Sequence, residues 1–159
     1  MRKTKLNPPP LDPENDRMTT LKAFCVGFAT LATSLSAAAA GDEGYTDDPL
    51  DKVLAAMTSK KAILVDVREK REWDRGHIKG AILVPLSQIQ EWESKGITEA
   101  EKAKLAKQLP KGSVIYCHCA AGARALPGGE GLKKLGYDAR PLRSGYRALV
   151  EAGFPKSSQ

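Results

Sequence analysis

A short loop around one cysteine carries the strongest chemical signal in the sequence. It follows an apolar run that ends near Cys117, and it comprises Cys119, Ala120, Ala121, Gly122, Ala123, Arg124 and Ala125. A tight loop between a strand and a helix points successive backbone N–H groups inward, which makes a cradle for an anion. Such a cradle and a nearby arginine lower a cysteine pKa from about 8.5 towards roughly 3.5 to 7.5. We therefore predict that Cys119 is a nucleophilic thiolate, although a free cysteine is more commonly a small buried hydrophobe.

Two further side chains near this loop leave alternatives open. Arg68 either faces the same crevice, where it would bind an anionic substrate, or forms an ion pair with Glu72 four residues along a helix. Cys117 lies two residues before Cys119, so an extended strand would point both thiols to one face. Cys117 either forms a strained, reducible disulfide with Cys119 or packs as a buried cysteine beneath the loop. Asp66 is expected to be structural, because it is placed to accept backbone N–H groups at the turn that follows it.

The elements that must position this loop are indicated by the apolar patterns. Short continuous apolar runs at 62–65, 81–84 and 114–117 are typical of strands buried on both faces of a parallel sheet. Helical patterns lie at 50–57, 69–74, 86–92, 98–108, 132–135 and 146–152. Strands that alternate with helices predict an α/β fold with an open parallel sheet, flanked by helices on both faces and binding ligands at the carboxyl ends of its strands. That rule selects the loops after Val65 and Cys117.

Glycines are concentrated in the helix expected behind the cysteine loop. Gly128, Gly129 and Gly131 follow Pro127 there. Each interior glycine costs about 1 kcal/mol relative to alanine. We therefore expect this helix to be short or mobile.

The first forty residues predict an export signal. Residues 1–17 are polar and rich in proline, and an uncharged, mostly apolar run of 13 residues follows at 23–35. Ala38 and Ala40 fit the small-residue rule for cleavage, and Met18 begins a more compact signal. A membrane-crossing helix needs roughly 20 apolar residues, so we expect removal of the signal, with membrane contact only if it is retained. The predicted organisation is a signal at 1–40, a flexible lead at 41–47 and one domain at 48–155, exported to the periplasm or secreted.

Composition and charge limit the classes of function. A chain of 159 residues allows one ordinary domain. Its net charge of +6 would suit nucleic-acid binding, but the basic residues are interleaved with acidic ones and only 6% of residues are aromatic, so we expect no nucleic-acid partner. The three cysteines do not form the paired sets of a structural zinc site, and Cys117, His118 and Cys119 lack a nearby fourth ligand, so no metal is expected.

Five motifs occur in an order and spacing that together are specific. They are Val65-Asp66-Val67-Arg68, Glu72-Trp73, Gly76-His77-Ile78-Lys79-Gly80-Ala81, Cys119-x-x-Gly122-x-Arg124 and Leu135-Gly136-Tyr137. This set, which covers roughly 48–154, resembles the rhodanese-like sulfurtransferase domain. The resemblance implies an α/β domain in which Cys119 takes a sulfane sulfur from a small donor such as thiosulfate and becomes a persulfide. Cyanide or another thiol, including that of a partner protein, would then accept the sulfur in a ping-pong reaction. No cofactor is implied, and we expect a monomer.

The number of residues between Cys119 and Arg124 distinguishes this loop from the phosphate-binding loop of cysteine phosphatases. Cysteine phosphatases hold phosphate with five residues between cysteine and arginine, whereas four separate Cys119 from Arg124. Apart from Arg124 the loop is uncharged, so thiosulfate would have few cationic partners and another donor, such as a protein persulfide, is an alternative. Two other functions stay open: a non-catalytic sulfur carrier or binding module that keeps the fold, and a redox protein that uses Cys117 and Cys119.

Overall fold

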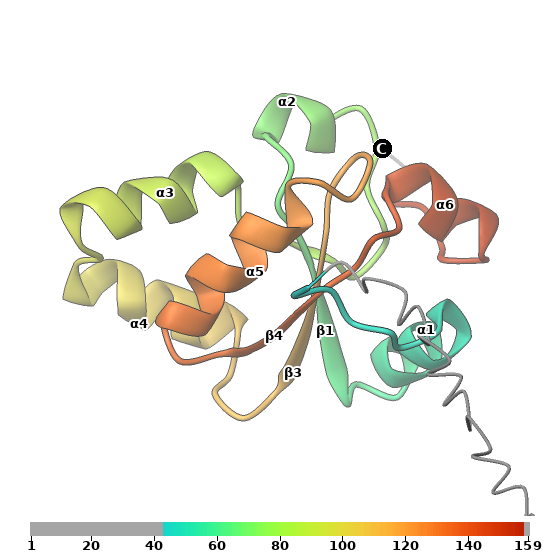
Figure 1. Ribbon diagram of the computed structural model, residues 1–159, viewed down its shortest axis with the longest axis horizontal. Coiled ribbons are helices and arrows are strands. Elements are labelled where there is room, and N and C mark those ends of the chain that lie inside the picture. The colour runs from blue at the N-terminus through green and yellow to red at the C-terminus, as the bar shows by residue number, and fades with distance from the viewer. Residues whose placement is uncertain (1–42, 158–159) are drawn as a thin grey trace, which may run out of the picture. The chain divides into compact units, whose positions relative to one another are not determined.

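Ten helices and strands lie along residues 43–157, the part of the chain that the computed structural model describes. The helices are α1 (Leu50–Thr58), α2 (Lys70–Trp73), α3 (Leu86–Lys95), α4 (Glu99–Gln108), α5 (Ala125–Lys134) and α6 (Tyr146–Glu151). The strands are β1 (Ala62–Asp66), β2 (Ile82–Leu83), β3 (Val114–His118) and β4 (Asp138–Pro141) (Figure 1). The predicted export signal, with its cleavage site and Met18, lies outside the described residues. None of the described helices has the length and apolar character needed to cross a membrane.

The four strands form one parallel sheet in the order β2-β1-β3-β4. At its centre β1 and β3 are paired from Ala62 opposite Val114 to Asp66 opposite His118. Both strands therefore end at the same edge of the sheet, and the loops that follow Asp66 and His118 begin side by side. The predicted open parallel α/β sheet is confirmed, with β4 as a strand that the sequence analysis did not identify.

Side chains of the central strands alternate between two apolar layers. Val65 and Ile115 pack on one face with apolar residues of α3, α4 and α5. Leu64 and Tyr116 pack on the other face with residues of α1 and α6. Figure 1 shows the same division, with α3, α4 and α5 on one side of the sheet and α1 and α6 on the other. The expectation of helices on both faces is thus confirmed.

The helix behind the cysteine loop, α5, is ten residues long and contains all three glycines. A Cβ atom added at these buried glycines would meet a neighbouring side chain far inside contact distance: 2.8 Å from Val67 Cγ1 for Gly128, 2.5 Å from Pro141 Cγ for Gly129 and 2.2 Å from Ile89 Cγ2 for Gly131. The glycines therefore let α5 lie close to the sheet and to α3. The pattern at 132–135 covered only part of this helix, because the sequence analysis counted the helix-propensity cost of glycine and not the close packing that glycine allows. The expected mobility of the helix stays a prediction.

The segment before α1 is held against the domain over its described part. Thr46 N–H donates to the Pro141 carbonyl at 2.8 Å. The Tyr45 hydroxyl donates a long hydrogen bond, 3.5 Å, to the Gly122 carbonyl, and the Arg143 guanidinium lies 4.7 Å from the centre of the Tyr45 ring. Tyr45 and Thr46 therefore bond to the domain within the predicted lead, and residues 41 and 42 lie outside the described part.

Candidate active site

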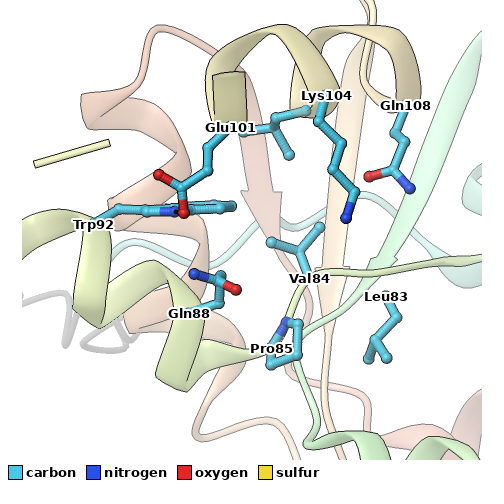
Figure 2. Close-up of a pocket in the computed structure, with 9 residues that line it drawn as sticks. Leu83, Val84, Pro85, Gln88, Trp92, Glu101, Lys104 and Gln108 are labelled. Atoms are coloured by element: carbon cyan, nitrogen blue, oxygen red, sulfur yellow. Dashed lines mark hydrogen bonds between the residues drawn. The ribbon is translucent and has the colours of Figure 1, made fainter. Parts of the chain in front are cut away.

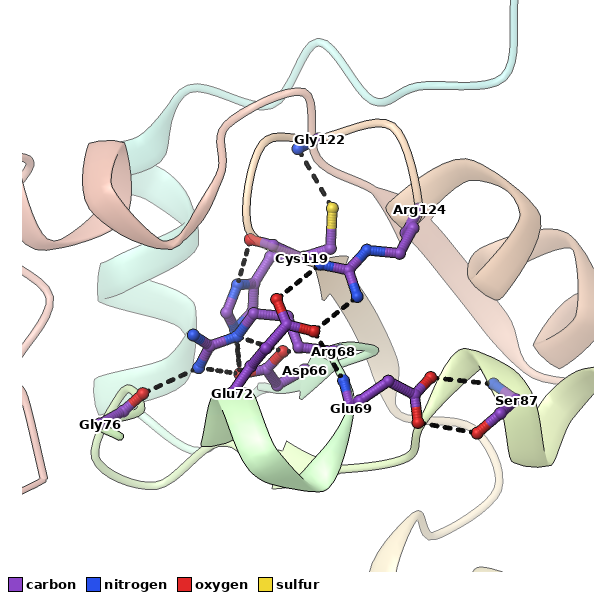
Figure 3. A network of polar contacts seen from close by, with 10 residues as sticks. Asp66, Arg68, Glu69, Glu72, Gly76, Ser87, Cys119, Gly122 and Arg124 are labelled. Carbon is purple, nitrogen blue, oxygen red and sulfur yellow. Dashed lines mark hydrogen bonds and ion pairs between the residues drawn. The ribbon is translucent and has the colours of Figure 1, made fainter. Parts of the chain in front are cut away.

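Cys119 is the first residue after β3, and its side chain is almost fully covered, with 1% of its surface exposed. Its Sγ accepts a hydrogen bond from the Gly122 N–H at 3.1 Å (Figure 3). Gly122 has a φ of +96°, and a Cβ atom there would lie 2.2 Å from the Arg143 carbonyl oxygen. Only glycine suits this position, because it combines a left-handed backbone with close approach of another segment. The loop therefore turns one of its amides onto the sulfur.

The other predicted loop residues form a small rim around this turn. Ala120, Ala121 and Ala123 are exposed, whereas Ala125 is buried and is the first residue of α5. The loop is tied at both ends by backbone hydrogen bonds, Tyr146 N–H to the Cys119 carbonyl at 2.8 Å and Ala125 N–H to the Gly122 carbonyl at 2.9 Å. The exposed part of the loop thus consists mainly of alanines, next to a covered cysteine.

Arg124 forms a two-pronged ion pair with Glu72, with both N···O distances at 2.7 Å (Figure 3). The Arg124 hydrogen bonds lower the pKa of Glu72 to about 2. The pKa of Arg124 is raised above its ordinary value, mainly by Glu72 and to a smaller extent by the adjacent Cys119. Glu72 itself is positioned by α2, since its carboxylate also accepts the Glu69 N–H at 3.1 Å in a capping box. A short helix therefore sets a carboxylate against the arginine of the cysteine loop.

Arg68 does not form the ion pair with Glu72 that was considered from the sequence. Its guanidinium is buried and bonded to the Asp66 carboxylate, with Nε 3.0 Å from Oδ1 and 2.8 Å from Oδ2 and Nη2 2.6 Å from Oδ2. Nη2 also donates to the Gly76 carbonyl at 2.9 Å, and the group lies over the Tyr146 ring at 4.4 Å. The predicted partner, Glu72, is taken by the arginine of the cysteine loop. The ion pair of Arg68 with Glu72 was therefore predicted wrongly, and substrate binding by Arg68, whose guanidinium is buried and bonded to Asp66, stays a prediction.

Asp66 accepts the Arg68 backbone N–H at 2.9 Å, which confirms the turn predicted for it. Asp66 also lies next to His118, which the sequence analysis did not propose as a site residue. This imidazole is fully buried, with Nδ1 3.3 Å from the Cys119 carbonyl and Nε2 3.6 Å from Asp66 Oδ2. Burial lowers the pKa of His118, and Nε2 has no hydrogen-bond partner within the described residues. The sequence could have pointed to His118, because it directly follows the predicted apolar strand at 114–117, just as Asp66 follows the one at 62–65. In the structure the two residues end β3 and β1 and lie opposite each other.

Cys117 lies in β3 with no exposed surface, in the apolar layer that also contains Cys119. The two thiols therefore share a face, as their spacing predicted. Both are free, and burial raises the pKa of Cys117 to about 12. Cys117 therefore matches the second of its two alternatives, a buried thiol packed beneath the loop. Disulfide exchange requires a thiolate, and the raised pKa of Cys117 opposes its formation.

The described part of the chain also has cavities away from the cysteine loop. A cavity of about 260 Å³ lies between the end of β2 and helices α3 and α4, where Trp92 Nε1 donates to Glu101 at 3.0 Å (Figure 2). Within residues 43–157, no three histidine, cysteine, aspartate or glutamate side chains gather in a way that would hold a metal ion. The chemistry is therefore concentrated at the carboxyl ends of β1 and β3.

The fold and this cysteine loop define a known class of domain. Residues 50–152 match the family model of the rhodanese-like domain, and the chain belongs to that family. It is 30% identical over 145 residues to the probable adenylyltransferase/sulfurtransferase MoeZ of Mycobacterium tuberculosis; this match covers 91% of the chain but only 33% of the relative, so the chain spans about a third of that protein's length.

Two solved structures are similar to the chain. The human single-domain sulfurtransferase TSTD1 is 26% identical, with a TM-score of 0.54 over 64% of this chain and 92% of the human one. A rhodanese-related protein from Thermoplasma volcanium is 25% identical, with a TM-score of 0.55 over 72% of this chain and 100% of the other. These similarities agree with the family assignment.

Proposed function

We propose that the protein is a sulfurtransferase that carries sulfane sulfur as a persulfide on Cys119. The observation that carries the proposal is the Gly122 N–H aimed at Cys119 Sγ from 3.1 Å, in a loop closed by Arg124. An amide held in this way favours negative charge on the sulfur without reorganisation during the reaction. Family membership and similarity to a human sulfurtransferase support the same chemistry.

The reaction has two covalent steps. The Cys119 thiolate attacks the outer sulfur of the donor, so that an Sγ–S bond forms while the bond between that sulfur and the rest of the donor breaks. The bonding electrons leave with sulfite when the donor is thiosulfate, or with a thiolate when it is an organic persulfide. An acceptor, cyanide or a thiolate, then attacks the terminal sulfur and restores the Cys119 thiolate. No further oxidant or reductant is needed, and ping-pong kinetics follow.

The surroundings of the sulfur favour a donor that presents its sulfur at the end of a narrow group. Cys119 is covered, and the exposed rim consists of the methyl groups of Ala120, Ala121 and Ala123. Such a rim admits a terminal sulfur and offers no charged side chain of its own to a bulky anion. We further propose that the protein acts as a monomer after export, with a small thiol or a protein thiol as acceptor.

The test is the intact mass of the reduced, purified protein before and after a donor is added. Thiosulfate and glutathione persulfide are tried separately, and cyanide is added last. A gain of one sulfur, about 32 Da, that cyanide removes is expected for a persulfide intermediate. Cys119→Ser should gain nothing, whereas Cys117→Ser, the matched control two residues away, should still be loaded.

The outcomes separate the candidate functions. Loading that cyanide does not discharge indicates a sulfur carrier without turnover. A protein that neither donor loads is a binding module, and the proposal fails. Loss of loading in Cys117→Ser but not in Cys119→Ser contradicts the assignment of the nucleophile.

A further inference from the structure

The charges next to the cysteine loop are balanced in pairs. Two arginines approach the loop from the ends of the central strands, and each is bonded to a carboxylate: Arg68 to Asp66, and Arg124 to Glu72. Another cation near the loop, Arg143, has its guanidinium stacked on the Tyr45 ring. The rhodanese-like loop thus contains an arginine whose charge is neutralised by a carboxylate of the same protein.

We propose that Glu72 determines which sulfur donor the site accepts: by occupying Arg124, it disfavours inorganic dianions such as thiosulfate and favours organic persulfides. This inference rests on the proposed persulfide chemistry of Cys119. It assigns to Glu72 a role in specificity that is separate from the chemical step.

The geometry of the pair makes Glu72 an effective competitor of an anionic donor. Two N–H groups of Arg124 are directed at the two carboxylate oxygens, each at 2.7 Å, and this two-pronged arrangement is the strongest that the groups can form. Glu72 is also fixed from behind by the Glu69 N–H at the start of α2. A donor anion gains these N–H groups only if it displaces a carboxylate that is already in place.

Burial strengthens this competition. Glu72 and Arg124 side chains are 24% and 33% exposed, so water screens the pair only in part. Charge-charge interactions are larger at such sites than between fully exposed groups. A second anion beside Glu72 would therefore meet repulsion from the carboxylate as well as the loss of a cation.

The two kinds of donor differ in the charge that they bring to this position. Thiosulfate carries two negative charges within one small group, and the departing sulfite retains both. An organic persulfide, R–S–SH, brings no charge on its sulfurs when protonated. The Cys119 thiolate takes its outer sulfur with the proton, the S–S bond between the two donor sulfurs breaks, and R–S⁻ leaves, so a single negative charge is conserved throughout. The neutralised loop suits the second reaction better than the first.

The experiment compares two charge-removing variants of the same short helix. Glu72→Gln releases Arg124, whereas Asp74→Asn removes an equal charge from the other end of α2, where the carboxylate is half exposed and bonded to Lys70. Rates of Cys119 loading by thiosulfate and by glutathione persulfide are measured by quenching and intact mass. We expect Glu72→Gln to raise the thiosulfate rate about tenfold at subsaturating donor, the size of one released charge-assisted hydrogen bond. The persulfide rate should change less than about twofold, and Asp74→Asn should alter neither rate.

A second variant keeps the proposal testable if Glu72→Gln also shifts the loop. Adding Arg124→Gln to Glu72→Gln should return the ratio of the thiosulfate rate to the persulfide rate to its wild-type value, because the freed cation is then gone, and any effect of Arg124 on the sulfur itself acts on both donors. The proposal is overturned if Glu72→Gln and Asp74→Asn give the same ratio of the two rates, or if Glu72→Gln slows both donors equally. A wild-type protein that neither donor loads contradicts the proposed sulfurtransferase function itself, which is a different result.

Discussion

Replacing Gly122 with alanine should lower both the free energy of unfolding and the rate of sulfur loading. The structure gives a separate physical reason for each loss. The left-handed backbone, φ +96°, costs an alanine about 1–2 kcal/mol. The new Cβ would lie 2.2 Å from the Arg143 carbonyl oxygen, whereas packed atoms rest at about 3.5 Å. The loop and the neighbouring backbone must therefore move apart by about 1 Å, and overpacking of this kind costs about 1–3 kcal/mol more. The expected loss in the free energy of unfolding is about 2–5 kcal/mol.

Gly153→Ala is the matched control for the backbone cost. Gly153 has a φ of +93° shortly after the end of α6, and nothing lies within 4 Å of a Cβ atom there. This variant should lose only about 1–2 kcal/mol, the cost of the left-handed backbone alone. Urea unfolding, followed by fluorescence and circular dichroism, measures both variants.

Sulfur loading should distinguish the two variants more sharply. Movement of residue 122 takes its N–H away from Cys119 Sγ, and loss of one such donor slows comparable reactions about a hundredfold. Gly153→Ala should load at the wild-type rate. If Gly122→Ala loses no more stability than Gly153→Ala, the close contact with Arg143 does not constrain the loop. If it loads at the wild-type rate, the Gly122 amide has no part in activating the sulfur.

Two further predictions concern the ion pairs beside the loop. Asp66→Asn should reduce the free energy of unfolding in urea by about 3–5 kcal/mol, because it leaves the buried Arg68 guanidinium without its counter-charge; a loss within the range of an exposed surface pair would contradict this. The pKa of Glu72 is about 2 in the folded protein against an ordinary value of 4.5, so the pair with Arg124 stabilises the fold fully above about pH 4.5 and this contribution disappears as the pH falls towards 2. Unfolding measured across that range should therefore show a smaller loss of stability in Glu72→Gln than in the wild type, and parallel curves would exclude the pair as a source of stability.

The central strands could be predicted from the sequence because a strand that is buried on both faces consists of consecutive apolar residues. β1 and β3 are covered by helices on both faces, and their predicted positions agree with the structure to within one residue. β4 could not be found in this way. It is an edge strand with the sequence Asp138-Ala-Arg-Pro141, and its polar side chains serve ion pairs, with Arg140 bonded to Asp138 and Asp48.

The cysteine loop was predicted from its residue types, but its partners were not. Spacing along a helix suggested that Glu72 pairs with Arg68, since the two are only four positions apart. In the structure Glu72 bonds Arg124, which is 52 residues away, because the loops after β1 and β3 begin at the same edge of the sheet. Helical spacing rules describe only residues that are close in sequence. They do not say whether Arg68 reaches Asp66 or Glu72 once β1 and β3 have paired.

The glycine-lined contact of α5 ties the reactive centre to the packing of the whole domain. Ten residues with three glycines have little tendency to form a helix in isolation, and helices shorter than about 12–15 residues are marginal in water even with favourable sequences. α5 therefore depends for its stability on the surfaces of α3 and the sheet. The cysteine loop leads directly into α5 and is fixed at its far end by the first turn of that helix. The position of the Gly122 amide on the Cys119 sulfur thus depends on contacts made far from the loop, on the other side of α5.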